Sequence, residues 1–295
     1  MQISPTAIRS PGRSWLFVPG NNERYLAKAE QCEADVLLLD LEDGVPPDDK
    51  QRGREMVAAY LAVPSDKVRF VRVNALPTGL LPDDLEAVVH PGLDGVCLPK
   101  AESASDILTL ADSLDRLETG RGLLPGSTRI LAAIESARGL LAAYDIGAAH
   151  PRVVGLMFGA EDFALDLGLV TNRRHEAADL TYARSALVVA ATAAGVMSVD
   201  GVYPHLADED GLAADTRRCL NHGFSGKSTF SPRQLRTIHA VFEPEPDELD
   251  FSRRVIAAFD AAVAKSTGSA VVDGQLVDRP IVLRTRRVLE RGELA

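Results

Sequence analysis

Charged side chains follow a series of short apolar segments, and they are the residues of this sequence best suited to carry chemistry. They are Glu42, Asp43, Arg72, Lys100, Glu135 and Asp162. Each lies at or just after the end of an apolar segment of strand length. If the segments are parallel strands of one barrel, their carboxyl ends meet at one mouth, so these residues converge there whatever their separation in the sequence.

Glu135 and Asp162 follow the fifth and sixth apolar segments, which are expected to be neighbours. Two carboxylates at adjacent strand ends form a hard oxygen site of the kind that magnesium prefers. No histidine stands beside them to favour zinc. We therefore expect Mg²⁺, with Mn²⁺ as a possible substitute. The alternative is that each is an exposed loop acid or a helix cap.

Arg72 and Lys100 each have two possible partners. Arg72 alternates with apolar neighbours in the segment RFVRVN (69–74), which directs it into the mouth of a barrel. A guanidinium there needs an anion, either an internal acid such as Glu42 or Asp43 or the carboxylate of a bound substrate. The same choice applies to Lys100, so the sequence leaves both possibilities open and makes all four residues candidates for substrate binding.

The elements that position these residues are eight apolar segments separated by helix-like segments. The apolar segments span residues 15–19, 36–41, 69–74, 95–100, 129–135, 153–159, 197–202 and 223–231. They are continuous rather than alternating, as is typical of parallel strands buried on both faces. Eight such repeats predict an α/β fold, a (β/α)₈ TIM barrel. An open doubly wound sheet is the rival, but no GxGxxG follows the first segment, which disfavours a dinucleotide-binding version.

The composition changes after the predicted barrel, which we place at residues 1–242. Residues 243–250 (EPEPDELD) are expected to form an acidic linker to a C-terminal appendage that completes residues 243–295. Within it the sequence predicts a helix at 251–265, a hairpin turning at Asp273-Gly274 and a final helix at 281–291. This helix–hairpin–helix is too small to fold alone, so we expect it to pack on its own barrel or on a neighbouring subunit.

Charge and composition narrow the class of protein. The chain has 295 residues, with 32 basic against 42 acidic ones and a formal net charge of −10. This balance disfavours binding to nucleic acid or to an anionic membrane. The three cysteines form no CxxC pair, and neither a secretory signal nor a membrane-spanning segment is apparent. A cytoplasmic protein acting on a small molecule is expected.

Several motifs together resemble the citrate lyase β-subunit-like proteins, a group of the wider HpcH/HpaI aldolases that includes malyl-CoA and citramalyl-CoA lyases. They are VPGN (18–21), DLED (40–43), IES (134–136), GAED (159–162) and VDGQLVDRP (272–280). The likeness covers nearly the whole chain. It implies a magnesium-dependent barrel enzyme that forms a homotrimer.

The resemblance also implies roles for individual residues. Glu135 and Asp162 would bind the metal, and Arg72 would contact substrate oxygens, with Glu42 and Asp43 supporting the site through waters. Asp278, in the C-terminal motif, would be lent to the active site of the adjacent subunit as an acid–base. Its alternative role is to cap the last helix, because Arg279-Pro280 follow it.

The activity that the resemblance implies is retro-Claisen cleavage of a CoA thioester of a short β-hydroxy dicarboxylic acid to a 2-oxo acid and acetyl-CoA. Alternatives are a thioesterase, the β-subunit of a carrier-protein-dependent citrate lyase, and a non-catalytic binding protein. The sequence departs from the family at Ser231, where histidine is usual, and at His205, where an acid is common. Both lie near the expected path of the thioester, so they bear on the substrate more than on the metal.

Overall fold

The computed structural model describes residues 12–170 and 179–294, and the chain divides into two compact units. One unit spans residues 11–238, and the other consists mainly of residues 239–295. The division falls inside helix α10 (Leu235–Phe242), a few residues before the boundary predicted at 242.

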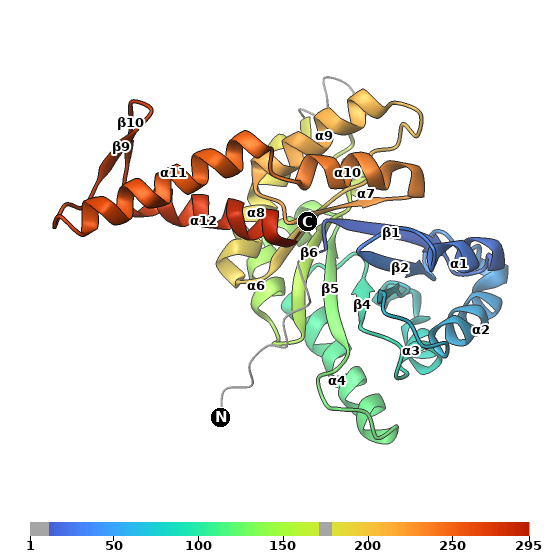
Figure 1. Cartoon of the computed structure of the whole chain (residues 1–295). Helices are drawn as coiled ribbons and strands as arrows, with labels where there is room; N and C mark the ends of the chain where they lie inside the picture. The colour runs from blue at the N-terminus through green and yellow to red at the C-terminus, as the bar shows by residue number, and fades with distance from the viewer. Residues whose placement is uncertain (1–11, 171–178, 295) are drawn as a thin grey trace. The chain divides into compact units, whose positions relative to one another are not determined.

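Eight parallel strands form a closed barrel in the first unit, with each strand hydrogen-bonded to the next and β1 to β8 (Figure 1). The strands are β1 (Ser14–Pro19), β2 (Val36–Asp40), β3 (Val68–Arg72), β4 (Gly95–Leu98), β5 (Arg129–Ile134), β6 (Val153–Phe158), β7 (Met197–Asp200) and β8 (Gly226–Thr229). Each lies within one of the predicted segments or overlaps it closely. The prediction of a (β/α)₈ barrel is confirmed.

The helices of this unit connect successive strands around the barrel. They are α1 (Glu23–Ala29), α2 (Lys50–Leu61), α3 (Leu81–Val88), α4 (Ala104–Gly120), α5 (Ala137–Leu141), α6 (Ala143–Ala148), α7 (Ala160–Asp166), α8 (Thr181–Ala194) and α9 (Glu209–His222). The helix-like segment between the sixth and seventh apolar segments, residues 176–194, corresponds to α8, and its residues 176–178 lie outside the described residues. Within the described ranges, no helix combines the length and the apolar character needed to cross a membrane.

The barrel interior is filled by alternate residues of the strands. Trp15 and Phe70 meet edge to face with ring centroids 5.2 Å apart, and Leu38, Ala133 and Met157 belong to the same buried cluster. Successive side chains of a strand point to opposite faces. The residues two positions beyond Leu38, Phe70, Ala133 and Met157 therefore point toward the barrel axis at the mouth, and this alternation sets the composition of the site.

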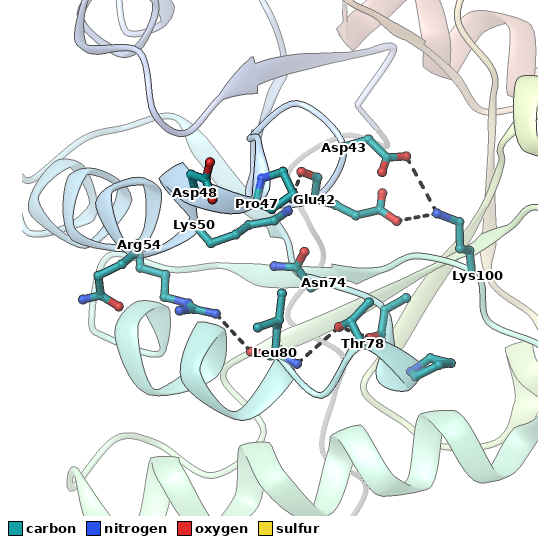
Figure 2. A pocket seen from close by; sticks show the side chains of 13 residues that line it. Glu42, Asp43, Pro47, Asp48, Lys50, Arg54, Asn74, Thr78, Leu80 and Lys100 are labelled. Carbon is teal, nitrogen blue, oxygen red and sulfur yellow. Dashed lines mark hydrogen bonds and ion pairs between the residues drawn. The ribbon is translucent and has the colours of Figure 1, made fainter.

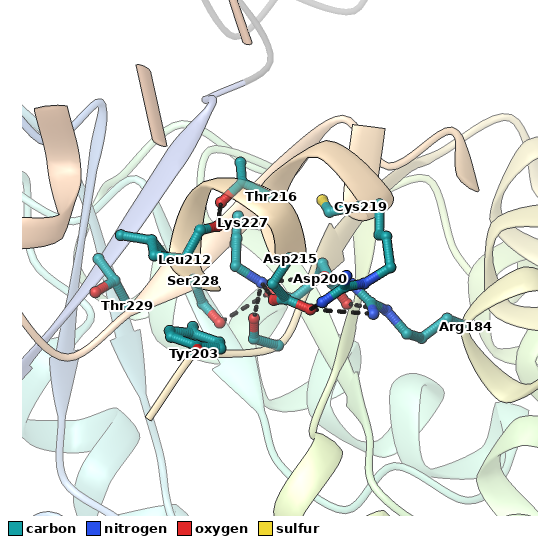
Figure 3. A network of polar contacts seen from close by, with 12 residues as sticks. Arg184, Asp200, Tyr203, Leu212, Asp215, Thr216, Cys219, Lys227, Ser228 and Thr229 are labelled. Atoms are coloured by element: carbon teal, nitrogen blue, oxygen red, sulfur yellow. Dashed lines mark hydrogen bonds and ion pairs between the residues drawn. The ribbon is translucent and has the colours of Figure 1, made fainter. Parts of the chain in front are cut away.

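A buried ion network ties the last two strands to the helices outside them (Figure 3). Lys227 of β8 is 1% exposed, and its Nζ lies 2.6 Å from Asp215 Oδ2 of α9 and 3.2 Å from Asp200 Oδ2 of β7. It also donates to the carbonyl of Gly201, and Arg184 of α8 pairs with both acids. Every ammonium proton of Lys227 has an acceptor, so this lysine serves the fold.

The second unit contains α11 (Pro246–Val263), strands β9 (Ala270–Val272) and β10 (Gln275–Val277), and α12 (Arg279–Leu294) (Figure 1). Its apolar core is made by Val255, Val272, Val277 and Val282. The hairpin turns at Asp273 (φ 50°) and Gly274 (φ 78°), the left-handed pair that an Asp-Gly turn requires.

The predicted acidic linker at 243–250 is wrong in its second half, because α11 already begins at Pro246. Proline is favoured in the first turn of a helix, and the side chains of Glu245 and Glu248 form a capping box there. The acidic residues that suggested a linker are therefore the residues that stabilise a helix N-terminus.

Glu118, near the end of α4, is a buried acid that links α4 to the segments around β5 and β6. It is fully buried and accepts hydrogen bonds from the backbone of Gly126 and Thr128 (both 2.7 Å) and from Arg152 Nη2 (2.6 Å). Burial alone would raise the pKa of Glu118, but the hydrogen bonds from Arg152, Thr128 and Gly126 outweigh it and lower the pKa to about 2.

We expect Glu118→Gln to lower the free energy of unfolding at pH 7 by about 3 kcal/mol, because Arg152 loses its buried partner. The unfolded carboxyl titrates near pH 4.5. The stabilisation is therefore complete above that pH and is lost as the pH falls toward 2, so the difference between variant and wild type should shrink in acid. Denaturant unfolding from pH 7 to pH 3 measures it. Glu86→Gln is the control, since the Glu86 side chain is 70% exposed; equal losses in both variants would contradict the assignment.

Candidate active site at the barrel mouth

The inward-facing layer at the strand ends includes Asp40, Arg72, Glu135 and Gly159. Asp40 and Arg72 lie two positions beyond the core residues Leu38 and Phe70 and are paired in the register of β2 and β3. Glu135 and Gly159 lie two positions beyond Ala133 and Met157 on the neighbouring β5 and β6. The closed barrel thus brings two acids, a guanidinium and a glycine to one layer.

Arg72 is held by internal acids. Its Nε and Nη2 donate to the two oxygens of Asp40 at 2.8 and 2.7 Å, and its Nη1 lies 2.9 Å from Glu42 Oε2. The guanidinium also stacks over the Phe17 ring at 4.8 Å. Burial opposes its charge, but Asp40 and then Glu42 reverse that effect and raise the pKa of Arg72. Of the two internal partners proposed from the sequence, Glu42 is present and Asp43 is not.

Asp40 is the functional residue that sequence reasoning missed as a partner. Besides Arg72 it accepts the backbone N–H groups of Glu42 and Gly44, both at 2.9 Å. A Cβ on Gly44 would come within 2.3 Å of Asp40 Oδ2, so only glycine fits this approach. The alternation of β2 and β3 contains the signal, because it places Asp40 and Arg72 on the same face.

Lys100 joins the loop after β2 to the end of β4 (Figure 2). Its Nζ donates to Glu42 Oε1 at 2.8 Å and lies 3.7 Å from Asp43 Oδ2. Burial would lower the pKa of Lys100, but the hydrogen bond and charge of Glu42 raise it. Burial also raises the pKa of Glu42, and the cations Arg72 and Lys100 offset this only in part.

Glu135 is confined on both sides. The backbone N–H of Lys100 donates to its Oε2 at 3.1 Å. On the other side, a Cβ on Gly159 would lie 2.4 Å from Glu135 Cγ, so the side chain fits only against a glycine. Burial, followed by the charge of Glu42, raises the pKa of Glu135 to about 7; Arg72 opposes this and Asp162 adds to it.

Asp162, in the first turn of α7, completes the predicted set. It is half-buried, and its charge acts on both Glu135 and Lys100. When all four are ionised, Asp40, Glu42, Glu135 and Asp162 place four negative charges near the two positive ones of Arg72 and Lys100. Within residues 12–170 and 179–294, no group of three or more His, Cys, Asp or Glu side chains could hold a metal ion. Any cation here would rely on one or two carboxylates and on other oxygens.

Asp278 belongs to the second unit and precedes α12. Its side chain is exposed, and its Oδ1 accepts a hydrogen bond from the backbone of Ile281 at 3.4 Å. It therefore makes the helix-cap contact that was the alternative to a catalytic role, while its carboxylate stays accessible to solvent.

Two cavities flank the loop of residues 40–44. One, of about 690 Å³, is lined by Glu42, Asp43, Lys50, Arg54, Asn74 and Lys100 among others (Figure 2). The other, of about 910 Å³, is lined by Phe17, Tyr25, Lys28, Arg72, Phe230 and Arg233 among others. Asp43 contributes to both cavities.

The two departures from the family pattern lie at or near the larger cavity. Ser231 lines it, and the Ser231 side chain accepts from the backbone N–H of Arg233 at 3.3 Å. The exposed His205 packs edge-on against Tyr203 with ring centroids 5.4 Å apart, next to Leu206, which also lines this cavity.

Comparison with known proteins agrees with this architecture. The model of the family described as HpcH/HpaI aldolase/citrate lyase matches residues 13–232, which include every strand end described above. The chain belongs to this family. Among its relatives in the HpcH/HpaI family is the citrate lyase subunit beta of Escherichia coli K12, 40% identical over 96% of this chain and 94% of that protein. The (3S)-malyl-CoA thioesterase of Cereibacter sphaeroides is 36% identical over 96% of this chain and 95% of the relative.

Solved structures of CitE and citrate lyase beta subunit proteins are also similar to this chain. CitE from Mycobacterium tuberculosis in complex with magnesium, acetoacetate and coenzyme A aligns with a TM-score of 0.82 at 33% identity, covering 97% of this chain and 99% of that one. The citrate lyase beta subunit of the same organism with oxaloacetate and magnesium aligns with a TM-score of 0.69 at 34% identity, covering 80% and 99%.

Asp40→Asn tests whether this carboxylate organises the site. An amide can neither balance the buried Arg72 nor accept all four of its present hydrogen bonds, so we expect a loss of about 3 kcal/mol in the free energy of unfolding. Denaturant unfolding measures the loss. Asp43→Asn is the matched control, because the Asp43 side chain is 64% exposed and should change stability by less than about 0.5 kcal/mol. Equal stability of the two variants would refute the assignment.

Proposed function

We propose that this chain is a magnesium-dependent carbon–carbon lyase. Its substrate would be a CoA thioester of a short β-hydroxy dicarboxylic acid, of the malyl-, citramalyl- or citryl-CoA type, which it cleaves to a 2-oxo acid and acetyl-CoA or forms from them. The observation that carries the proposal is the surplus of carboxylates around Glu135, set beside a fixed Arg72 at the barrel mouth.

The residues present fit a divalent cation. Four carboxylates against two side-chain cations leave a formal charge of −2 among Asp40, Glu42, Glu135 and Asp162 with Arg72 and Lys100. Glu135 and Asp162 would hold Mg²⁺, and an ion that keeps several waters needs only one or two protein carboxylates. Mn²⁺ would fit the same oxygen ligands. Complexes of M. tuberculosis CitE with magnesium and small carboxylates support this assignment.

The larger cavity suits the thioester arm. It begins at Asp40 and Arg72, where a reacting group would lie, and its walls include the aromatic rings of Phe17 and Phe230, packed 5.1 Å apart. Lys28 and Arg233, both exposed, add positive charge to its wall, as the phosphates of coenzyme A require. The coenzyme A complex of M. tuberculosis CitE supports a ligand of this class.

The chemistry follows from the charges in the site. Bound magnesium would supply Lewis-acid polarisation of the oxygen that becomes the carbonyl of the 2-oxo acid. The β-hydroxyl would pass its proton to the acid–base Asp278, the C–C bond would break, and the electron pair of that bond would pass to the thioester as an enolate. Arg72, kept charged and immobile by Asp40 and Glu42, would stabilise that oxyanion through its remaining N–H groups. Asp278 would then protonate the enolate carbon.

Asp278 would act on the barrel of an adjacent subunit in a homotrimer. Its exposed carboxylate and its place beside a short hairpin are compatible with that role. We expect Asp278→Asn to lose lyase activity while it keeps its oligomeric state by sedimentation.

Mixing two inactive variants tests whether Asp278 acts between subunits. Asp278→Asn and Glu135→Gln subunits, dissociated and reassembled together, should regain part of the activity, because some sites then combine intact residues from two chains. No recovery from mixed oligomers would place Asp278 outside the neighbouring site.

The reaction is tested directly by product analysis. The protein is incubated with Mg²⁺ and malyl-, citramalyl- and citryl-thioesters of CoA, and 2-oxo acid and free thiol are assayed separately. A lyase releases oxo acid without thiol. We expect Glu135→Gln to reduce kcat by about 10²-fold or more while remaining folded by circular dichroism. Asp145→Asn, on the surface of α6, is the control. Full activity of Glu135→Gln, or of wild type in chelator, would refute the metal assignment.

Thioester hydrolysis is the second candidate, because the C. sphaeroides thioesterase matches the same 96% of the chain. Thiol released without oxo acid would favour it. A third outcome is activity only on a carrier-protein thioester, which would indicate a subunit of a citrate lyase complex, as the E. coli relative is by name.

A further inference from the structure

Lys100 has a backbone conformation that a lysine rarely adopts. Its φ of 52° lies in the left-handed region, where a side chain with a Cβ is strained. Among the described residues, Ser266 and Asp273 are the other non-glycine residues with a positive φ, and both belong to the second unit. Lys100 instead lies two residues after the end of β4, among the charged residues of the barrel mouth.

This conformation directs two groups of one residue to two different acids. The backbone N–H of Lys100 donates to Glu135 Oε2 at 3.1 Å. Its Nζ donates to Glu42 Oε1 at 2.8 Å (Figure 2). The next residue is hydrogen-bonded to the neighbouring strand β5, since Ala101 N donates to the carbonyl of Ala133 at 3.1 Å. The left-handed turn is therefore confined to Lys100.

Neither group alone explains a lysine here. Glycine adopts this φ without strain and would offer the same N–H to Glu135. The side chain must therefore be retained for the contact of Nζ with Glu42. That contact holds one oxygen of Glu42 while Arg72 lies beside the other, which keeps the Glu42 carboxylate from turning toward Glu135.

We propose that Lys100 is a positioning residue with two separable roles: its strained backbone fixes the Glu135 carboxylate for the cation, and its ammonium fixes Glu42. The inference deepens the proposed function and depends on it for the metal. A positioning role differs from direct substrate binding by the Lys100 side chain. Direct binding would require neither the left-handed backbone of Lys100 nor the contact of its N–H with Glu135.

The stability of Lys100→Gly and Lys100→Ala tests the backbone role. Both lose the ammonium, and only alanine keeps the strained Cβ. Glycine normally lowers stability relative to alanine, so at Lys100 the order should reverse, with the glycine variant melting about 2 °C or more above the alanine variant in chelator. Arg116→Gly and Arg116→Ala, on the exposed face of α4, provide the control pair with the normal order. The normal order at Lys100 would overturn the backbone role.

Binding of Mn²⁺ alone, followed by electron paramagnetic resonance, tests the link to the cation without turnover. Lys100→Gly should bind Mn²⁺ within about threefold of wild type, and Lys100→Ala about tenfold more weakly, because its chain relaxes away from Glu135. If Lys100 had only a structural role, the two variants would differ in melting temperature but would bind Mn²⁺ with nearly equal affinity. Equal Mn²⁺ affinities in the two variants would overturn the role toward Glu135.

Lys100→Met keeps the apolar stem and removes only the charge. We expect kcat to fall by about tenfold or more with little change in the KM of the thioester, since Glu42 loses its restraint. A raised KM with unchanged kcat would overturn positioning in favour of substrate binding. Absence of Mn²⁺ binding by the wild-type protein would refute the proposed metal and the role of Lys100 toward it. The order of the melting temperatures of Lys100→Gly and Lys100→Ala in chelator would still decide the backbone role.

Discussion

The arrangement of the barrel mouth depends on the bidentate ion pair between Arg72 and Asp40. A guanidinium buried to this extent is unfavourable unless its charge is balanced by well-placed acceptors. Asp40 supplies them, and it also accepts the N–H groups of Glu42 and Gly44, so the loop after β2 is folded around the same carboxylate. That loop fixes Glu42, Glu42 holds the side chain of Lys100, and the backbone of Lys100 reaches Glu135.

The buried charges between strands and helices differ from those at the barrel mouth in the ratio of acids to cations. Lys227 and Arg152 are paired with buried acids, and they tie helices to strands. At the mouth the acids outnumber the cations, and burial together with neighbouring acids raises the pKa values of Glu42 and Glu135. Acidic groups whose pKa values are raised at an accessible position are typical of functional sites. A bound cation can offset the repulsion between such acids where the protein's own cations do not.

Most of the fold and part of the site could be predicted from the sequence, and the division has physical causes. Apolar segments of strand length report burial directly, so all eight strands could be located. The convergence of Arg72 and Glu135 follows from parallel strands alone. Identifying Asp40 rather than Asp43 as the partner of Arg72 required the register of β2 and β3. The alternation of inward and outward residues along both strands indicates this register, whereas the position of a single acid does not.

Other features depend on tertiary contacts that no local pattern reports. The left-handed backbone of Lys100 contradicts the intrinsic preference of lysine and accompanies its contacts with Glu42 and Glu135. The need for glycine at position 159 arises from Glu135 on the adjacent strand. The beginning of α11 at Pro246 was encoded locally, but its acidic first turn resembles a solvated linker until the capping box is recognised.

Because the Asp43 carboxylate lines both cavities, whatever occupies one of them shares a wall with the occupant of the other. A ligand that attracts or displaces this side chain on one side changes the surface presented on the other. Thermodynamic linkage makes such an effect reciprocal: if a first ligand tightens the binding of a second by some factor, the second tightens the first equally. Ligands in the two cavities would then be coupled through one exposed aspartate as well as through the buried charges beneath it.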